Sequence, residues 1–143
     1  MTRLFALGVV VRSLAIATVV SACFTSVAPR HFAPANRATG VMGTVAVTGG
    51  GQLSGELLAV NDTAYVMLID SRVTVAPYGT LSAARFAVVG QVTRAAGEAP
   101  PTKDRRRLAS YARFPYGIPA PAMAALLAKS GQTTEDAVGP DHR

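Results

Sequence analysis

The thiol of Cys23 is the strongest nucleophile that this sequence offers, and it is the only cysteine among 143 residues. It comes directly after Val20, Ser21 and Ala22, at the end of an uncharged apolar run that begins at Leu14. A thiolate is the reactive form of cysteine, and it accepts acyl and alkyl groups readily. A single cysteine cannot close an intramolecular disulfide. Cys23 is therefore a nucleophile that cannot be used in a disulfide within this chain.

Three carboxylates, Glu56, Asp62 and Asp70, are the candidates for general acid and base chemistry. Two of them at one edge of a fold could support hydrolysis. Each also has a simpler interpretation, since Glu56 fits a solvent-facing strand position, Asp62 a turn and Asp70 a strand end. The histidines, His31 and His142, lie near the chain ends, where nothing holds them against a base or a metal. We therefore predict no catalytic residue, no metal and no cofactor.

A cluster of cations, Lys103 and Arg105 to Arg107, is the densest charge run in a chain whose formal net charge is +6. Such a run is a candidate anion-binding site. A solvated helix face is the simpler interpretation. At the start of a helix these arginines would oppose the helix dipole, which favours an external anion.

The first 22 residues have the pattern of an export signal. Arg3 and Arg12 precede the apolar run, and Ser21 and Ala22 end it with small side chains. This order of charged, apolar and small residues is typical of a secretory signal peptide. The run after Arg12 is too short to cross about 30 Å of hydrocarbon. We expect residues 1–22 to form a signal-peptide helix that is removed.

The sequence Val20-Ser21-Ala22-Cys23 resembles the lipobox of bacterial lipoproteins. The resemblance implies that signal peptidase II recognises residues 20–22 and that Cys23 becomes the first residue, carrying diacylglyceryl and acyl chains such as palmitate. Several acyl chains anchor a protein more firmly than one. Phe24 stands where a signal for inner-membrane retention often has Asp, so we expect the outer membrane, facing the periplasm. The alternative is an ordinary signal peptide that ends near Cys23.

The mature chain is predicted to be mainly β. Residues 23–40 contain Pro, Asn and Gly without apolar periodicity and indicate a flexible tether. Runs of β-branched residues separated by turn formers then predict five antiparallel strands within residues 41–94, namely 41–48, 53–60, 63–70, 72–77 and 85–93. Five short strands suggest a small closed barrel of the SH3 or Sm-like kind. The strand 63–70 is apolar on both faces and should be central.

Residues 51–70 resemble the first signature of Sm-like small barrels. In that family a glycine inside the second strand allows a sharp bend, and Gly55 would do so here. No counterpart of the family's second signature, which contacts RNA, occurs near residues 88–94. The resemblance therefore favours the barrel shape and gives no support to RNA binding.

The C-terminal third is predicted to be helical. Residues 95–104 form a linker, residues 105–130 two short helices in a hairpin, and residues 131–143 a disordered tail. Asp104 could cap the first helix and Pro119 begin the second. The aromatic residues between Tyr111 and Pro119 would attach the helices to the sheet, although such rings also recognise peptides and sugars.

These observations predict a non-catalytic lipoprotein of the cell envelope that acts as an interaction or structural module. Its expected partners are the membrane, reached through the lipid anchor, and an envelope protein or an anionic wall or lipid component. Two alternatives remain open: a cell-envelope hydrolase that uses Glu56, Asp62 or Asp70, and an anion or nucleic-acid binder that uses the cluster from Lys103 to Arg107. Nucleic acid is the less favoured anion for an exported protein.

Overall fold

The computed structural model describes residues 37–93 and 95–139. The predicted signal peptide, Cys23 and residues 20–22, the first part of the tether, and both histidines lie outside these ranges. The elements in the described ranges are β1 (Met42–Val47), β2 (Gln52–Val60), β3 (Ala64–Ile69), β4 (Arg72–Pro77), the short 3-10 turn η1 (Tyr78–Thr80), β5 (Leu81–Phe86), β6 (Gly90–Thr93), α1 (Thr102–Ala109), α2 (Ala120–Lys129) and β7 (Asp136–Ala137).

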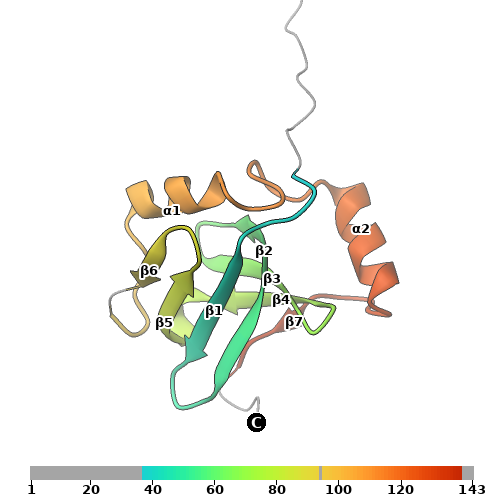
Figure 1. Cartoon of the computed structure of the whole chain (residues 1–143). Helices are drawn as coiled ribbons and strands as arrows, with labels where there is room; N and C mark the ends of the chain where they lie inside the picture. The colour runs from blue at the N-terminus through green and yellow to red at the C-terminus, as the bar shows by residue number, and fades with distance from the viewer. Residues whose placement is uncertain (1–36, 94, 140–143) are drawn as a thin grey trace, which may run out of the picture. The chain divides into compact units, whose positions relative to one another are not determined.

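The strands form one open, strongly curved sheet in the order β6-β5-β1-β2-β3-β4-β7 (Figure 1). Neighbouring strands are antiparallel, except that β7 runs parallel to β4. The prediction of a mainly β protein with two helices is confirmed, whereas the closed five-stranded barrel is wrong. The region predicted as a strand over 85–93 is the end of β5, a turn and β6, and β7 pairs with the remaining edge of β4. The sheet therefore ends in two separate edges.

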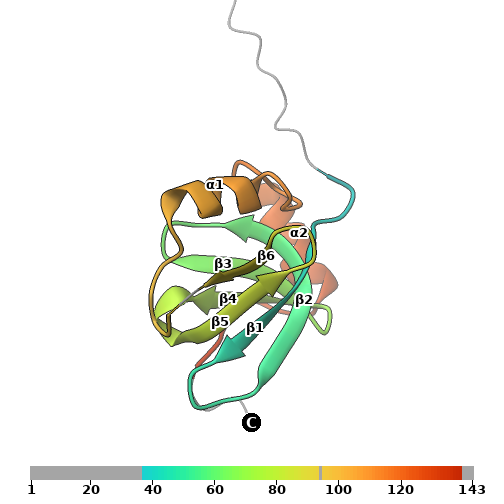
Figure 2. The same ribbon diagram turned by 60° about the vertical axis from the view of Figure 1, so that its left-hand side comes forward.

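Strand β2 joins the two halves of the curved sheet. Its first half pairs with β1 and its second half with β3, with Glu56 in both pairings. Figure 2 shows β2 as a long curved strand. A Cβ atom at Gly55 would lie 2.8 Å from Cγ1 of Ile69 and closer still to the carbonyl oxygen of Leu68. Glycine is therefore required here because β3 approaches so closely.

Strand β3 has apolar side chains on both faces, as predicted, and it lies between β2 and β4. On the inner face, Tyr65 and Met67 are fully buried in the larger apolar cluster, the inner core. On the outer face, Val66 and Leu68 belong to a second apolar cluster, the outer cluster, which includes side chains of α2. Burial on both faces explains why this strand lacks the alternation of a half-exposed strand.

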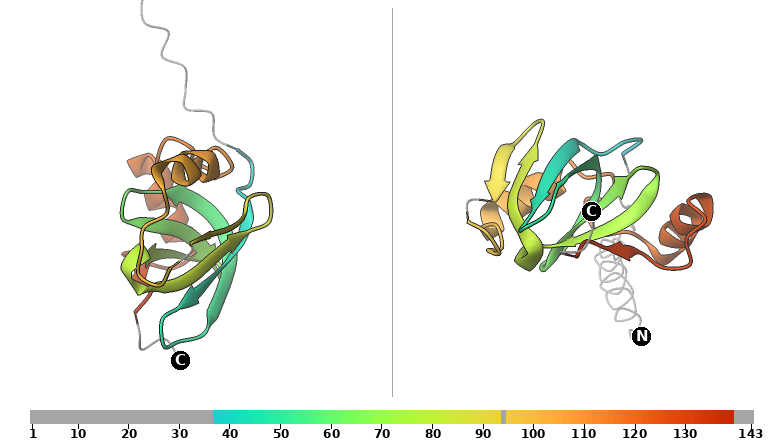
Figure 3. Two further views of the ribbon diagram at one scale, coloured as in Figure 1. Left: turned by 90° about the vertical axis from the view of Figure 1, so that its left-hand side faces the viewer. Right: turned by 90° about the horizontal axis from the view of Figure 1, so that it is seen from below.

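The two helices cover different parts of the sheet. Leu108 of α1 is fully buried in the inner core, whereas Met123, Leu126 and Leu127 of α2 pack in the outer cluster. Figure 3 shows α1 across one end of the curved sheet and α2 along its outer side. The predicted hairpin of helices is thus wrong, because each helix buries its apolar face in a different core.

The C-terminal boundaries also differ from those expected. Helix α1 begins at Thr102 after Pro101, so the linker is shorter than 95–104 and Asp104 lies in the first turn. Residues 131–139, expected to belong to a tail, follow the edge of β4, where Val138 is buried in the inner core. Its backbone N–H donates to the carbonyl oxygen of Val75 at 2.9 Å. The apolar pair Ala137 and Val138 was too short a pattern to indicate a strand.

Candidate functional site

The chain enters the domain at an ion pair between β2 and the segment that joins α1 to α2. Glu56 accepts a hydrogen bond of 2.9 Å from Nη2 of Arg113, and Nε of Arg113 lies 2.9 Å from the other carboxylate oxygen. That second oxygen also accepts the backbone N–H of Gly40 at 2.6 Å. The side chains are 12% and 22% exposed, so the pair is shielded from most solvent. Charge-assisted contacts of this kind fix geometry strongly.

Backbone hydrogen bonds extend this attachment. The N–H of Arg37 donates to the carbonyl oxygen of Arg113 at 2.9 Å, and that of Val41 donates to Tyr111 at 3.0 Å. The guanidinium of Arg37 lies 5.6 Å from the centre of the Tyr111 ring. Residues 37–40, predicted as the last part of the tether, are therefore bound to the domain. We call the part of the domain formed by residues 37–42, 87–89 and 102–118 the α1 end.

The predicted cation cluster lies on α1, and the fold pairs one of its cations while leaving the others exposed. Arg105 donates to the backbone carbonyl oxygen of Asp62 at 2.9 Å and to its carboxylate at 3.0 Å, so this arginine is already paired. Lys103, Arg106 and Arg107 are exposed, and their side chains have no hydrogen bond or ion pair within the described ranges. Of the four predicted anion-binding cations, these three remain accessible.

The expected conflict with the helix dipole does not occur. Because α1 begins at Thr102, Arg106 and Arg107 lie in its last turn, where positive charge is favourable. The helix begins three residues before its predicted start at residue 105. Support for an anion must therefore come from the exposure and placement of the cations.

Large apolar side chains are also exposed at the α1 end. Met42 is 57% exposed, Val88 52% and Tyr116 80%, and these are the exposed large apolar residues of the described part of the chain. The N–H of Ala87 donates to the carbonyl oxygen of Met42 at 3.0 Å, so the turn that carries Val88 lies beside the start of β1. Sequence reasoning missed this grouping because the three residues belong to three separate segments.

The three predicted acids do not form one arrangement. Glu56 is engaged by Arg113 and Gly40, whereas the side chain of Asp62 is 98% exposed and contacts Arg105. Asp70 lies in the turn between β3 and β4, at the opposite end of β3 from Asp62. Eight residues of extended chain separate these two by roughly 25 Å. The described ranges contain no group of three His, Cys, Asp or Glu side chains that could hold a metal ion.

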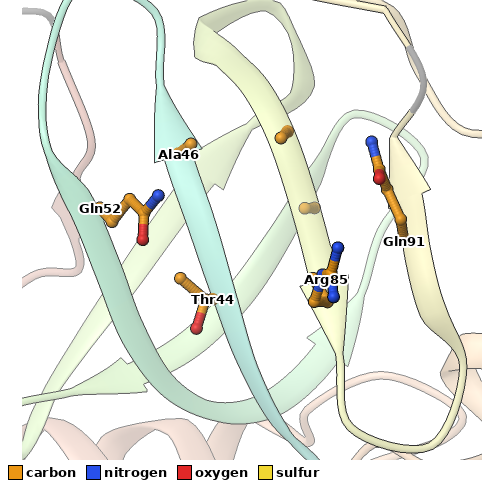
Figure 4. A pocket seen from close by; sticks show the side chains of 7 residues that line it. Thr44, Ala46, Gln52, Arg85 and Gln91 are labelled. Carbon is orange, nitrogen blue, oxygen red and sulfur yellow. The ribbon is translucent and has the colours of Figure 1, made fainter.

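A shallow groove of about 310 Å³ lies on the outer face of β1 and β5 (Figure 4). Its floor consists of alanines, and Arg85 is the only charged residue that lines it. The complete lining is Thr44, Ala46, Gln52, Ala83, Ala84, Arg85 and Gln91. Small side chains give the groove its depth, and amides and a guanidinium give its rim hydrogen-bonding groups. It suits a polar contact and has no pair of groups for acid and base catalysis.

Comparisons of this chain with protein-family models, curated proteins and solved structures each gave no significant match. Within residues 37–93 and 95–139, none of the helices has the length and apolar character needed to cross a membrane.

Proposed function

We propose that this protein is an exported lipoprotein, anchored through Cys23, whose folded domain is a non-catalytic interaction or structural module at the membrane surface. The observation that carries the proposal is the motif Val20-Ser21-Ala22-Cys23 at the end of a short apolar run. The expected location is the outer membrane, facing the periplasm. The acyl chains on Cys23 would hold the protein there.

The fold supports an anchored module in two ways. The described residues build two apolar clusters of their own. The ion pair between Glu56 and Arg113 and the hydrogen bond to Gly40 then fix where the chain enters that domain. A pull or constraint from the anchor is therefore applied at the α1 end. The groove beside Arg85, on the outer face of the sheet, remains available for a wall component or an envelope protein.

Mass spectrometry of the native protein tests the anchor directly. We expect a chain that begins at Cys23 and carries the added mass of a diacylglyceryl group and an amide-linked acyl chain. Cys23→Ser should abolish the added mass and release the protein from the membrane fraction, whereas Ser26→Ala, a matched change three residues away, should alter neither. An unmodified thiol, or a native N-terminus at any other residue, would refute the proposal.

A further inference from the structure

We infer that the α1 end is a docking surface for anionic lipid headgroups. Through this surface the domain would contact the bilayer in which its acyl chains are inserted. The inference deepens the proposed function. It depends on that function only in assuming that the protein is anchored through Cys23. Three observations carry it: the orientation of the cations on α1, the exposed apolar side chains beside them, and the place where the chain enters the domain.

The accessible cations of α1 point away from the domain. At about 100° per residue, Lys103, Arg106 and Arg107 fall within one face of the helix, on the side opposite to Leu108. Leu108 is fully buried in the inner core, so the cationic face is directed outward. Asp104 is the only acid on this helix, and it is half-buried. Arg37, which is exposed beside Tyr111, adds a fourth positive charge to the same end.

The apolar residues give this end the composition of a membrane-contacting surface. Met42, Val88 and Tyr116 are all more than half exposed, and each belongs to one of the three segments that form the α1 end. Figures 1 and 2 show the start of β1, the turn between β5 and β6, and the connection between α1 and α2 at the same end of the domain. Apolar and aromatic side chains combined with cations favour the headgroup region of an anionic bilayer. A protein or nucleic-acid partner would not require the apolar residues to surround the point where the chain enters.

The length of the chain permits this contact. Fourteen peptide units join Cys23 to Arg37, so these residues can be separated by at most about 50 Å. Arg37 is itself bound at the α1 end through Arg113. An anchor at Cys23 therefore allows the cationic face to reach the lipid, and the turn between β1 and β2 lies at the opposite end of the domain (Figure 1). Docking then adds little loss of translational freedom, because the anchor has already confined the domain.

Amide hydrogen exchange of the native, full mature chain in vesicles tests the inference. Vesicles that contain phosphatidylglycerol are compared with vesicles of phosphatidylcholine alone. We expect slower exchange in α1 and residues 87–89 only with phosphatidylglycerol, and no change in residues 48–51. Neutralising Lys103, Arg106 and Arg107 together to Gln should weaken docking about 100-fold, since each cation near an anionic surface contributes about fivefold. Lys129→Gln, a matched change at the end of α2, should leave docking within about twofold.

The outcomes separate this inference from the anchor. If Cys23 is acylated but exchange at the α1 end is the same in both kinds of vesicle, the docking surface is refuted and the lipoprotein stands. If Cys23 is not acylated, the same chain and its triple Gln variant are compared by co-sedimentation with both kinds of vesicle, and equal binding refutes the docking surface. Protection that appears without vesicles and rises with protein concentration would assign the surface to self-association and would also refute it. All three substituted side chains are exposed, so the variant should fold, and loss of the two favourable charges in the last turn of α1 should lower its melting temperature by only a few degrees.

Discussion

The side-chain amide of Gln132 pairs with the backbone of Val73 as a neighbouring strand would. Its carbonyl oxygen accepts the N–H of Val73 at 2.7 Å, and its NH₂ group donates to the carbonyl oxygen of Val73 at 3.1 Å. Ser130 Oγ donates to the same amide oxygen at 2.6 Å. Gln132 thus satisfies the edge of β4 just before β7 begins, and it is buried although it is polar. An unpaired strand edge would otherwise be exposed to pairing with another chain.

Replacing Gln132 by Ala should destabilise the fold by about 1 to 3 kcal/mol, because both backbone groups of Val73 lose their partner in a buried place. Gln52→Ala removes the same side chain from an exposed strand position, and its effect should stay within about 0.5 kcal/mol. Urea unfolding of both variants measures the difference. Equal midpoints for Gln132→Ala and the parent protein would show that the edge of β4 does not depend on this amide.

The ion pair between Glu56 and Arg113 predicts a second, larger effect. Glu56→Ala should lower the free energy of unfolding by about 3 kcal/mol. The substitution leaves the guanidinium of Arg113 shielded from solvent without its partner, and it removes the acceptor of the Gly40 N–H. Arg72→Gln breaks the exposed pair with Asp136, which likewise joins an arginine to a carboxylate, at 2.7 Å, and should lower the free energy of unfolding by less than about 1 kcal/mol. Thermal unfolding at equal pH and salt compares the two. Similar losses of stability in the two variants would show that burial does not strengthen the Glu56 pair.

The sequence predicts the parts of this fold that depend on local patterns. Apolar runs between turn formers placed β1 to β4 within one residue at each end, and the two-faced strand 63–70 was correctly identified as central. It could not predict the pairing of Glu56 with Arg113, 57 residues apart, or of Gln132 with Val73, 59 residues apart. Those contacts arise only when the sheet has curved and α1 has covered one end. The same long-range packing separates Arg105 from the exposed cations that surround it in sequence.

Gly55 should tolerate no side chain. Gly55→Ala places a methyl group against the backbone of Leu68 and 2.8 Å from Ile69, and strand β3 cannot move away because it is packed on both faces. We expect the free energy of unfolding to fall by about 3 kcal/mol or more. Gly51→Ala, in the turn at the start of the same strand, meets no atom within 4 Å and serves as the control. Chemical denaturation measures both, and a parent-like stability of Gly55→Ala would disprove the close approach of β2 and β3.

Tyr78 makes the stability of the domain depend on pH in the alkaline range. Burial raises the pKa of its phenol well above the usual value, and the electrostatic interaction with Tyr65 raises the pKa further. The hydroxyl donates to the carbonyl oxygen of Asn61 at 2.7 Å, a contact that only the neutral form makes. Above about pH 10 the unfolded chain releases this proton while the folded protein keeps it, so stability should fall by up to about 1.4 kcal/mol per pH unit. Below that pH the contribution is fully present.

Tyr78→Phe isolates this effect, because it keeps the ring that packs edge-on at 4.8 Å from Tyr65 and removes only the titrating group. At neutral pH the variant should lose about 1 kcal/mol with the hydrogen bond. Between about pH 10 and pH 11.5 its stability should fall less steeply than that of the parent, since its folded and unfolded states no longer differ in the affinity of this site for a proton. Tyr116→Phe, at an exposed position, should keep the parent's stability at neutral pH and serves as the control for the lost hydrogen bond. Urea midpoints measured across this range decide the matter: parallel curves for Tyr78→Phe and the parent would mean that the phenol titrates alike in the folded and unfolded chain.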